Sequence, residues 1–323
     1  MQKFLIIQTA FLGDVILATP VVSELRRLFP DAQIDLLVRK GNESLVQNNP
    51  HVNHTWVFDK KQGKLKQILQ LIKQIRSEKY TTVINLHRFG SSGLIAWRSG
   101  SKEKIGFDKN PFSFSYTRKI KHEIGNGKHE VERNLETIEH LGAVSRMRPS
   151  LFPSKSDFDQ VDKFKTASFF TLAPASVWFT KQLPESKWVE LALQLKTKGD
   201  VYLLGGPGDS ELCKRIQMGA GIPDKNNLAG ELSLMESAAL IANATRCFVN
   251  DSGPLHIASA MNTPTTAFFC ATIPDFGFGP LADDSEIKEV QENLDCRPCG
   301  LHGGKSCPKG HFKCGNIDVR IPN

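Results

Sequence analysis

The segment 250–256, NDSGPLH, places polar side chains and a glycine directly after a strongly apolar run. Its proline suits the first turn of a helix, so we expect a helix to begin there. Unpaired backbone N–H groups at a helix start bind anions, and Gly253 allows a ligand to approach the backbone closely. His256 can donate a hydrogen bond to a phosphate, and Asp251 can accept hydrogen bonds from sugar hydroxyl groups. The alternative is that Asp251 or Ser252 only caps the helix.

A second polar segment, 173–184 (APASVWFTKQLP), also joins an apolar run to a predicted helix. It contains Ser176, Thr180 and Lys181, two hydroxyl groups and one cation that together suit a diphosphate. The alternative is a surface lysine ahead of a helix that begins at a proline. The glycine-rich segment 204–209 matches neither Gly-x-Gly-x-x-Gly nor a phosphate-binding loop that ends in Gly-Lys-Ser/Thr. Dinucleotide binding and ATP hydrolysis are therefore poorly supported.

Near the N-terminus, Gly13 and Asp14 follow the apolar run 4–7 and begin a helical pattern. A carboxylate at this position is ionised at neutral pH. It can accept a proton from an attacking hydroxyl group, a general-base step that is typically worth about 10²–10⁴ in rate. The alternative for an isolated Gly-Asp is an aspartate that caps the helix.

Alternating apolar and amphipathic segments must position these polar residues. This alternation is typical of α/β domains with doubly wound parallel sheets, and it occurs twice, which predicts two Rossmann-like domains. Ligands bind at the carboxyl ends of strands in such sheets, so the polar segments should face a central cleft. Strands are expected at 4–7, 34–38, 82–86, 169–172, 201–204, 247–249 and 265–269, and helices at 14–28, 66–78, 184–195, 235–242 and 254–260.

A proline-containing polar stretch interrupts the alternation between residues 145 and 166. We therefore expect an N-terminal domain at 1–150, a linker at 151–166 and a C-terminal domain at 167–323. The net charge of +7 is unevenly divided, with +10 on residues 1–166 and −3 on residues 167–323. A basic half attracts nucleic acid, anionic lipid or a phosphorylated substrate, unless it is only a solvated surface.

No apolar run approaches the roughly 20 residues of a membrane span, and the N-terminus reads directly into a strand rather than a signal peptide. We expect a cytoplasmic protein without a transmembrane segment. Nucleic-acid binding is not expected, because the basic residues are scattered among strands and helices and no recognition module with interleaved aromatic residues is visible.

Four of the seven cysteines crowd the C-terminus, whereas the other three lie in apolar surroundings and should be buried thiols. In the C-terminal group, the first pair has zinc-knuckle spacing and the second pair does not. Structural zinc and reduced loop thiols are both open interpretations. A non-enzymatic zinc or nucleic-acid-binding protein is the corresponding functional alternative. The candidate metal ligands are Cys296, Cys299, Cys307 and Cys314.

Taken together, three motifs resemble glycosyltransferase family 9, the bacterial heptosyltransferases. They are Leu-Gly-Asp at 12–14, Lys-x-Leu-Pro at 181–184 and DSGPLH at 251–256, and their order and spacing fit over nearly the whole chain. The resemblance implies a GT-B architecture, in which two Rossmann-like domains face a central cleft. It implies that a heptose passes from ADP-heptose to a lipid-linked lipopolysaccharide core with inversion of the anomeric centre. A GT-B transferase for another nucleotide sugar or acceptor is the alternative.

The resemblance also implies roles for individual residues. Asp14 becomes the general base, and no metal or other cofactor is required. The donor is held by Gly13, Ser176, Thr180, Lys181, Asp251, Ser252, Gly253 and His256. The acceptor meets the basic N-terminal domain, which places the enzyme at the inner membrane surface as a peripheral protein. Candidate acceptor contacts, each of which is otherwise a solvated cation, are Arg88, Arg98, Lys102, Lys104, Arg118, Lys119 and Lys121.

Overall fold

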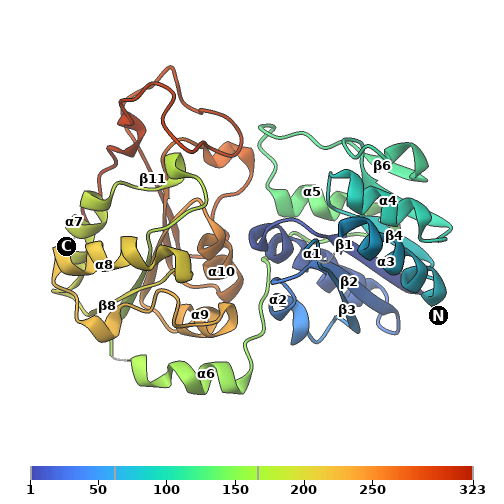
Figure 1. The fold of residues 1–323 in the computed structure, drawn as a ribbon, viewed down its shortest axis with the longest axis horizontal. Coiled ribbons are helices and arrows are strands. Elements are labelled where there is room, and N and C mark those ends of the chain that lie inside the picture. Colours follow the sequence, from blue (N-terminus) through green and yellow to red (C-terminus); the bar gives the residue numbers. More distant parts are fainter. Residues whose placement is uncertain (1, 62, 166, 322–323) are drawn as a thin grey trace. The chain divides into compact units, whose positions relative to one another are not determined.

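The computed structural model describes residues 2–61, 63–165 and 167–321 of the 323-residue chain. The chain divides into two compact units (Figure 1). Unit 1 comprises Met1–Ile124 and Lys128–Phe152, and unit 2 comprises Gly125–Gly127 and Pro153–Asn323.

Unit 1 contains a six-stranded parallel sheet in the order β3-β2-β1-β4-β5-β6. The strand order reverses between β1 and β4, where Ile6 lies opposite Leu36 on one side and Ile84 on the other. Such a switch point leaves a crevice at the carboxyl ends of the strands, where α/β proteins bind ligands. The strands are β1 (Lys3–Gln8), β2 (Gln33–Arg39), β3 (His54–Phe58), β4 (Thr82–Asn85), β5 (Glu103–Phe107) and β6 (Arg118–Ile120).

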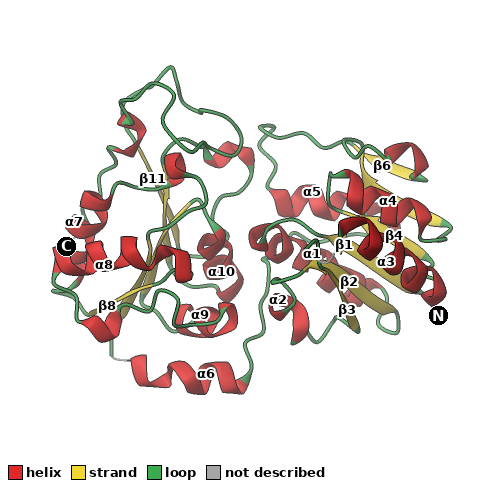
Figure 2. Cartoon of the chain, in the orientation of Figure 1, coloured by secondary structure: helices red, strands yellow, loops and turns green. Residues whose placement is uncertain are grey.

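Helices cover the unit 1 sheet so that the central strand is buried on both faces, as residues 4–8 of β1 show. On one face, Leu5 and Ile7 pack with Ile68 and Ile75 of the amphipathic helix α3, which itself contacts α4. α1 contacts β1 and β2 and packs against α5 (Figure 2). The helices are α1 (Leu12–Leu28), α2 (Ser44–Gln47), α3 (Lys64–Glu78), α4 (Gly90–Arg98) and α5 (Glu130–Glu136).

Unit 2 contains a five-stranded parallel sheet in the order β11-β10-β9-β7-β8. Its core includes Trp188 of α7, whose ring meets Phe268 of β10 edge to face at 5.3 Å. The elements are β7 (Phe169–Ala173), β8 (Asp200–Leu203), β9 (Arg246–Asn250), β10 (Thr265–Phe269), β11 (Ser285–Glu289), α6 (Lys155–Val161), α7 (Glu185–Leu195), α8 (Ser210–Ala220), α9 (Leu234–Ile241) and α10 (Gly253–Met261).

The structure confirms the predicted fold class, two α/β units with parallel sheets. Each predicted apolar run became a strand, and all of them except the edge strand β8 lie inside their sheets. The five predicted helices lie within about two residues of α1, α3, α7, α9 and α10. The edge strands β3, β6 and β11 and the inner strand β5 (EKIGF) escaped prediction because their sequences are short or charged. β11, for example, is SEIKE, and it is a strand because it pairs with β10. Within the segment predicted as a linker, α6 forms a helix that packs against α9.

Candidate active site

In unit 2, the two polar segments meet at the carboxyl ends of neighbouring strands. Lys181 ends the short 3-10 helix Phe179–Lys181 that follows β7, and Asp251 directly follows β9. Thr272 lies just beyond β10, and these three strands are adjacent in the sheet. Residues far apart in the sequence therefore converge, as expected for the ligand-binding edge of an α/β sheet.

Lys181 and Asp251 form an ion pair with 2.6 Å between Nζ and Oδ2, and only 15% and 8% of the two side chains is exposed. The hydroxyl group of Thr272 donates a second hydrogen bond, 2.7 Å long, to the same oxygen of Asp251. A charge so far from water is tolerated because it is paired. Lys181, predicted to bind a diphosphate, is thus held beside Asp251, predicted to bind a sugar. We call these two residues the Lys181–Asp251 pair.

The start of α10 lies next to this pair, and Pro254 is in its first turn, as predicted. Ser252 is the N-cap residue, and in the described helix start its side chain makes no capping hydrogen bond. Its hydroxyl group instead points to the carbonyl oxygen of Asn250 at 3.4 Å, and the Asp251 carboxylate is engaged by Lys181. Ser252 therefore occupies the N-cap position without capping α10 through its side chain, and the Asp251 carboxylate binds Lys181 and Thr272. His256 is buried one turn into the helix, near the ring of Phe278.

Asn250 fixes the segment that carries Lys181, a role that sequence reasoning missed. Its side-chain amide donates to the carbonyl oxygen of Pro174 at 2.7 Å and accepts from the backbone N–H of Leu183 at 2.9 Å. Ser176 lies on this segment, and its carbonyl oxygen accepts from the side chain of Gln182. The sequence signal that could have indicated this role is an asparagine at the end of an apolar, strand-like run.

Thr180 differs from the expectation of an open ligand contact. The residue is 1% exposed, and its hydroxyl oxygen accepts a hydrogen bond of 2.8 Å from the backbone N–H of Gly304. Thr180 is therefore tied to the C-terminal cysteine-rich segment.

In unit 1, Asp14 lies half-buried in the first turn of α1, directly after the switch point of the sheet, with Gly13 beside it. One oxygen of its carboxylate accepts from the backbone N–H of Phe11 at 3.1 Å, so Asp14 does cap the helix. Burial raises the pKa of Asp14 to about 6, and the charge of Glu130 contributes to this rise. Backbone hydrogen bonds and the charge of Arg88 act in the opposite direction. A carboxylate with this pKa is well matched to general-base chemistry near neutral pH.

His87 follows β4, the strand beside β1, and lies buried near the same edge of the sheet. A hydrogen bond of 2.8 Å joins its Nδ1 to the hydroxyl group of Thr9. Burial lowers the pKa of His87 to about 4, and the charges of Lys60 and Arg88 add to this effect. His87 is therefore a neutral imidazole at pH 7.

A buried charged network on α5 adjoins Asp14. Glu130 accepts from Arg133 Nε at 2.7 Å and lies 3.5 Å from His122 Nε2. Burial opposes ionisation of Glu130, but the hydrogen bond from His122 and the charge of Arg133 outweigh it and hold the pKa below its usual range. Glu130 is thus ionised, and its negative charge adds to the effect of burial on the pKa of Asp14. The sequence HEVER at 129–133 was the signal for this network.

Five of the predicted acceptor contacts lie on or beside the paired strands β5 and β6, whereas Arg88 and Arg98 come from other elements. Arg88 follows β4 and is close enough to influence the pKa of Asp14. Arg98 ends α4 with its guanidinium over the ring of Trp97, 4.2 Å from the centroid. Lys104 donates to the carbonyl oxygen of Ser101 at 2.6 Å. The exposed Lys102, the β6 residues Arg118 and Lys119, and Lys121, which pairs with Glu123, complete the set.

The zinc site considered at the C-terminal cysteines is not supported. Within residues 2–61, 63–165 and 167–321, no group of three or more His, Cys, Asp or Glu side chains is arranged to hold a metal ion. Cys314 is buried in the unit 2 core, and the thiol of Cys299 donates to the carbonyl oxygen of Cys296 at 3.1 Å. Cys307 is partly exposed. As predicted, the remaining cysteines are buried thiols, Cys213, Cys247 and Cys270.

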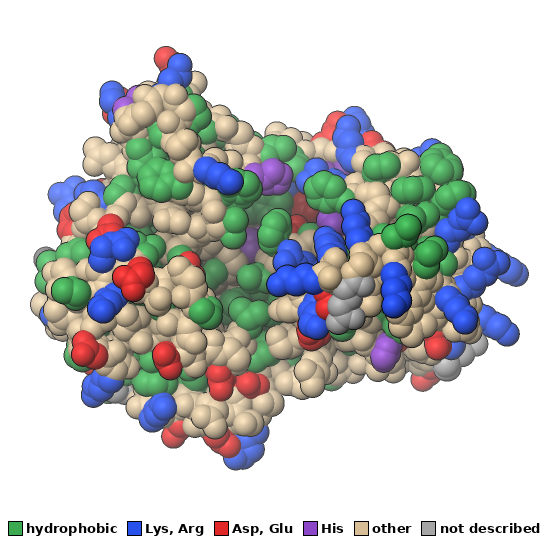
Figure 3. Space-filling model, viewed as in Figure 1, with side chains coloured by type: hydrophobic (Ala, Val, Ile, Leu, Met, Phe, Trp, Pro, Cys, Tyr) green, Lys and Arg blue, Asp and Glu red, His purple; other side chains and the backbone are tan. Residues whose placement is uncertain are grey.

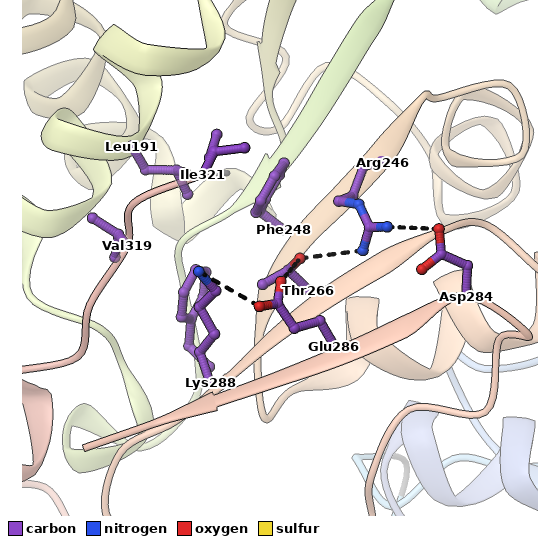
Figure 4. A pocket seen from close by; sticks show the side chains of 10 residues that line it. Leu191, Arg246, Phe248, Thr266, Asp284, Glu286, Lys288, Val319 and Ile321 are labelled. Carbon is purple, nitrogen blue, oxygen red and sulfur yellow. Dashed lines mark hydrogen bonds and ion pairs between the residues drawn. The ribbon is translucent and has the colours of Figure 1, made fainter. Parts of the chain in front are cut away.

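A cavity of about 320 Å³ lies elsewhere in unit 2, over β9, β10 and β11 (Figure 4). Its charged residues pair with one another, Arg246 with Asp284 at 2.6 Å and Lys288 with Glu286 at 3.6 Å. Its wall includes apolar residues such as Phe248. None of the residues that line it is a predicted site residue, so this cavity is not the candidate active site.

Comparison with known proteins identifies the family of this chain. Residues 68–303 match the family model described as glycosyltransferase family 9 (heptosyltransferase). The chain is 28% identical to lipopolysaccharide heptosyltransferase 3 of Escherichia coli, over 81% of this chain and 82% of that protein.

Two solved structures share the fold. One is an E. coli ADP-heptose lipopolysaccharide heptosyltransferase II, with a TM-score of 0.76, 22% identity and coverage of 93% of this chain and 96% of the other. The second is a family 9 glycosyltransferase of Veillonella parvula, with a TM-score of 0.79, 21% identity and coverage of 88% and 85%. This likeness confirms the GT-B fold class. The chain belongs to glycosyltransferase family 9, and it is a glycosyltransferase.

Proposed function

We propose that this enzyme transfers a heptose from ADP-heptose to a lipopolysaccharide core acceptor and inverts the anomeric centre. The observation that carries the proposal is the Lys181–Asp251 pair at the start of α10, in a chain whose family is described as heptosyltransferases. Two of the relatives reported above are named as lipopolysaccharide heptosyltransferases, and one of these two is named for ADP-heptose.

On the donor side, Lys181 and the backbone N–H groups at Ser252 and Gly253 hold the diphosphate. The helix start favours an anion, and the ammonium group offsets the negative charge that develops on the leaving ADP. Asp251 accepts hydrogen bonds from the hydroxyl groups of the heptose. His256 and Ser176 provide further polar contacts near the phosphates and the sugar.

On the acceptor side, Asp14 removes the proton from the attacking hydroxyl group. The acceptor oxygen forms a bond to the anomeric carbon while the bond from that carbon to the ADP oxygen breaks. ADP leaves with the electron pair, and the proton remains on Asp14. A single displacement of this kind inverts the anomeric centre, and the proposed mechanism draws on side chains and helix N–H groups for its charge stabilisation.

The acceptor that unit 1 suits best is anionic and lipid-linked. Lys and Arg side chains are numerous on the face of unit 1 seen in Figure 3, where hydrophobic side chains are exposed between them. Trp97, Phe112 and Phe114 form an aromatic cluster with ring centroids 5.7–6.0 Å apart, and Phe114 is 65% exposed. Aromatic rings next to cations favour the surface of an anionic membrane. We therefore propose that these aromatic rings and cations attach the enzyme peripherally to the inner membrane. No helix of the described residues is long and apolar enough to cross a bilayer.

The test is calorimetric titration of the purified protein with ADP-heptose, with ADP-glucose and UDP-glucose as controls. We expect selective binding of ADP-heptose that Lys181→Ala abolishes and Asp14→Asn leaves intact, whereas transfer to a core acceptor is lost in both variants. Tighter binding of another nucleotide sugar would refute ADP-heptose as the donor substrate. Normal turnover by Asp14→Asn would refute the assigned base.

A further inference from the structure

The cysteine-rich C-terminal segment has no part in the proposed chemistry, yet it contacts the donor side at two places. We propose that residues 297–304, here called the C-terminal arm, position the Lys181–Asp251 pair for the donor. Gly303, Gly304 and Arg297 are then positioning residues. This inference rests on the proposed function of the pair.

The first contact is a reciprocal pair of hydrogen bonds. The backbone N–H of Gly304 donates to the hydroxyl oxygen of Thr180 at 2.8 Å, and the backbone N–H of Thr180 donates to the carbonyl oxygen of Gly304 at 3.1 Å. Thr180 directly precedes Lys181 in a single 3-10 turn. So short a turn has little stability of its own, and its position depends on partners such as the arm.

Gly303 packs directly against the Lys181 side chain. Its φ of +72° lies in the left-handed region that favours glycine. A Cβ at this position would lie 2.9 Å from Lys181 Cγ and 2.9 Å from the hydroxyl oxygen of Thr180. The aliphatic part of the Lys181 side chain therefore packs against the backbone of Gly303, where any larger residue would collide with it. This contact restricts the position of the Lys181 ammonium group.

The second contact reaches the partner of Lys181. Arg297 donates to the carbonyl oxygens of Phe269 at 3.1 Å, Cys270 at 2.6 Å and Thr272 at 2.8 Å, and it pairs with Glu289. Arg297 thus holds the turn after β10 through hydrogen bonds to its backbone. Thr272 lies in this turn and donates a hydrogen bond to Asp251.

Two backbone hydrogen bonds join the two contacts into one unit. The N–H of Ala271 donates to the carbonyl oxygen of Thr180 at 3.2 Å, and the N–H of Cys299 donates to the carbonyl oxygen of Ala271 at 3.0 Å. The arm therefore holds both members of the pair through neighbouring residues. A site ordered before binding loses less conformational entropy when the donor arrives, so loosening the arm should weaken donor binding.

Gly310 provides a matched control for Gly303. Its φ is also +72°, but a Cβ there would meet no described atom within 4 Å. An alanine therefore introduces the same backbone strain at both positions, and the contact with Lys181 and Thr180 is affected at position 303 alone.

The experiment compares Gly303→Ala with Gly310→Ala in the full chain. We expect Gly303→Ala to raise the Kd and KM for ADP-heptose at least about tenfold, because small misplacements of binding groups have effects of this order. The KM for the acceptor should match that of Gly310→Ala. Arg297→Lys, which keeps the charge but loses the planar fork, should also weaken donor binding. Equal donor affinities in the two glycine variants would overturn the inference.

Hydrogen exchange without donor separates this inference from the proposed function. Amide exchange at Thr180, Lys181 and Asp251 should be faster in Gly303→Ala than in Gly310→Ala. If the wild-type protein does not bind ADP-heptose, the proposed function fails while the exchange result still tests the arm. If the wild type binds the donor but exchange is the same in both variants, the arm does not position the pair.

Discussion

Removing one charge or both charges of the Lys181–Asp251 pair should affect the stability of the fold and donor binding differently. The two side chains are 15% and 8% exposed and 2.6 Å apart. Removing one partner of such a pair leaves a buried charge without compensation and destabilises a protein by about 3–5 kcal/mol. We therefore expect Lys181→Met to lower the free energy of unfolding of unit 2 by this amount. Asp251→Asn, which keeps the hydrogen bond from Thr272, should cost less.

The double variant Lys181→Met/Asp251→Asn removes both charges at once. Its destabilisation should be about 2 kcal/mol or more below the sum of the single effects, because the two residues are in direct contact. Donor binding should nevertheless be lost in all three variants, since the ammonium group is absent from two of them and the sugar-binding carboxylate from the third. The double variant would thus recover stability without recovering function.

The assay is a urea titration followed by hydrogen-exchange mass spectrometry of unit 2 peptides, together with calorimetry of ADP-heptose binding. The control is Lys187→Met on α7, because Lys187 pairs with Glu190 at 3.1 Å at a more exposed site. This surface pair should contribute less than about 1 kcal/mol. If the destabilisation of the double variant equals the sum of those of the two single variants, Lys181 and Asp251 do not stabilise each other. Donor binding by the double variant would refute the assignment of the pair to the donor.

Four further predictions concern unit 1. The kcat/KM should fall as the pH decreases through about 6, where Asp14 becomes protonated. Because the pKa of Asp14 is raised, the folded state binds the Asp14 proton more tightly than the unfolded state does. Ionised Asp14 therefore destabilises the fold above about pH 6. Asp14→Asn should accordingly raise the Tm at pH 7 but not at pH 4. Glu130→Gln should shift the pH–rate profile to lower pH, because Glu130 contributes to the raised pKa of Asp14, and an unchanged profile would contradict this role. Phe114→Ser should reduce co-sedimentation with vesicles rich in phosphatidylglycerol, whereas Met218→Ser, an exposed apolar residue of unit 2, should not; equal loss in both would exclude the aromatic cluster as the attachment surface.

The candidate site was only partly predictable from the sequence. Asp14, Lys181 and Asp251 were found because each lies in a segment that joins a buried strand to a helix whose start is marked by a glycine or a proline. Thr272 was missed as a site residue, because a threonine after a strand carries no special signal, and Glu130 was not assigned a role although it lies in the charged sequence HEVER. Their roles depend on hydrogen bonds and charges across more than twenty residues of sequence.

Local patterns thus determined the elements and the order in which they occur. Apolar runs such as 4–7 and 247–249 must be buried on both faces, which makes them central parallel strands, and Pro254 marks the start of α10. Tertiary structure decided which polar groups meet. Thr180 was expected to face a ligand, but it bonds to Gly304, which is 124 residues away along the chain. Helix and strand periodicity is local and readable in the sequence, whereas the partners of a buried polar group depend on which distant segments the sheet order brings together.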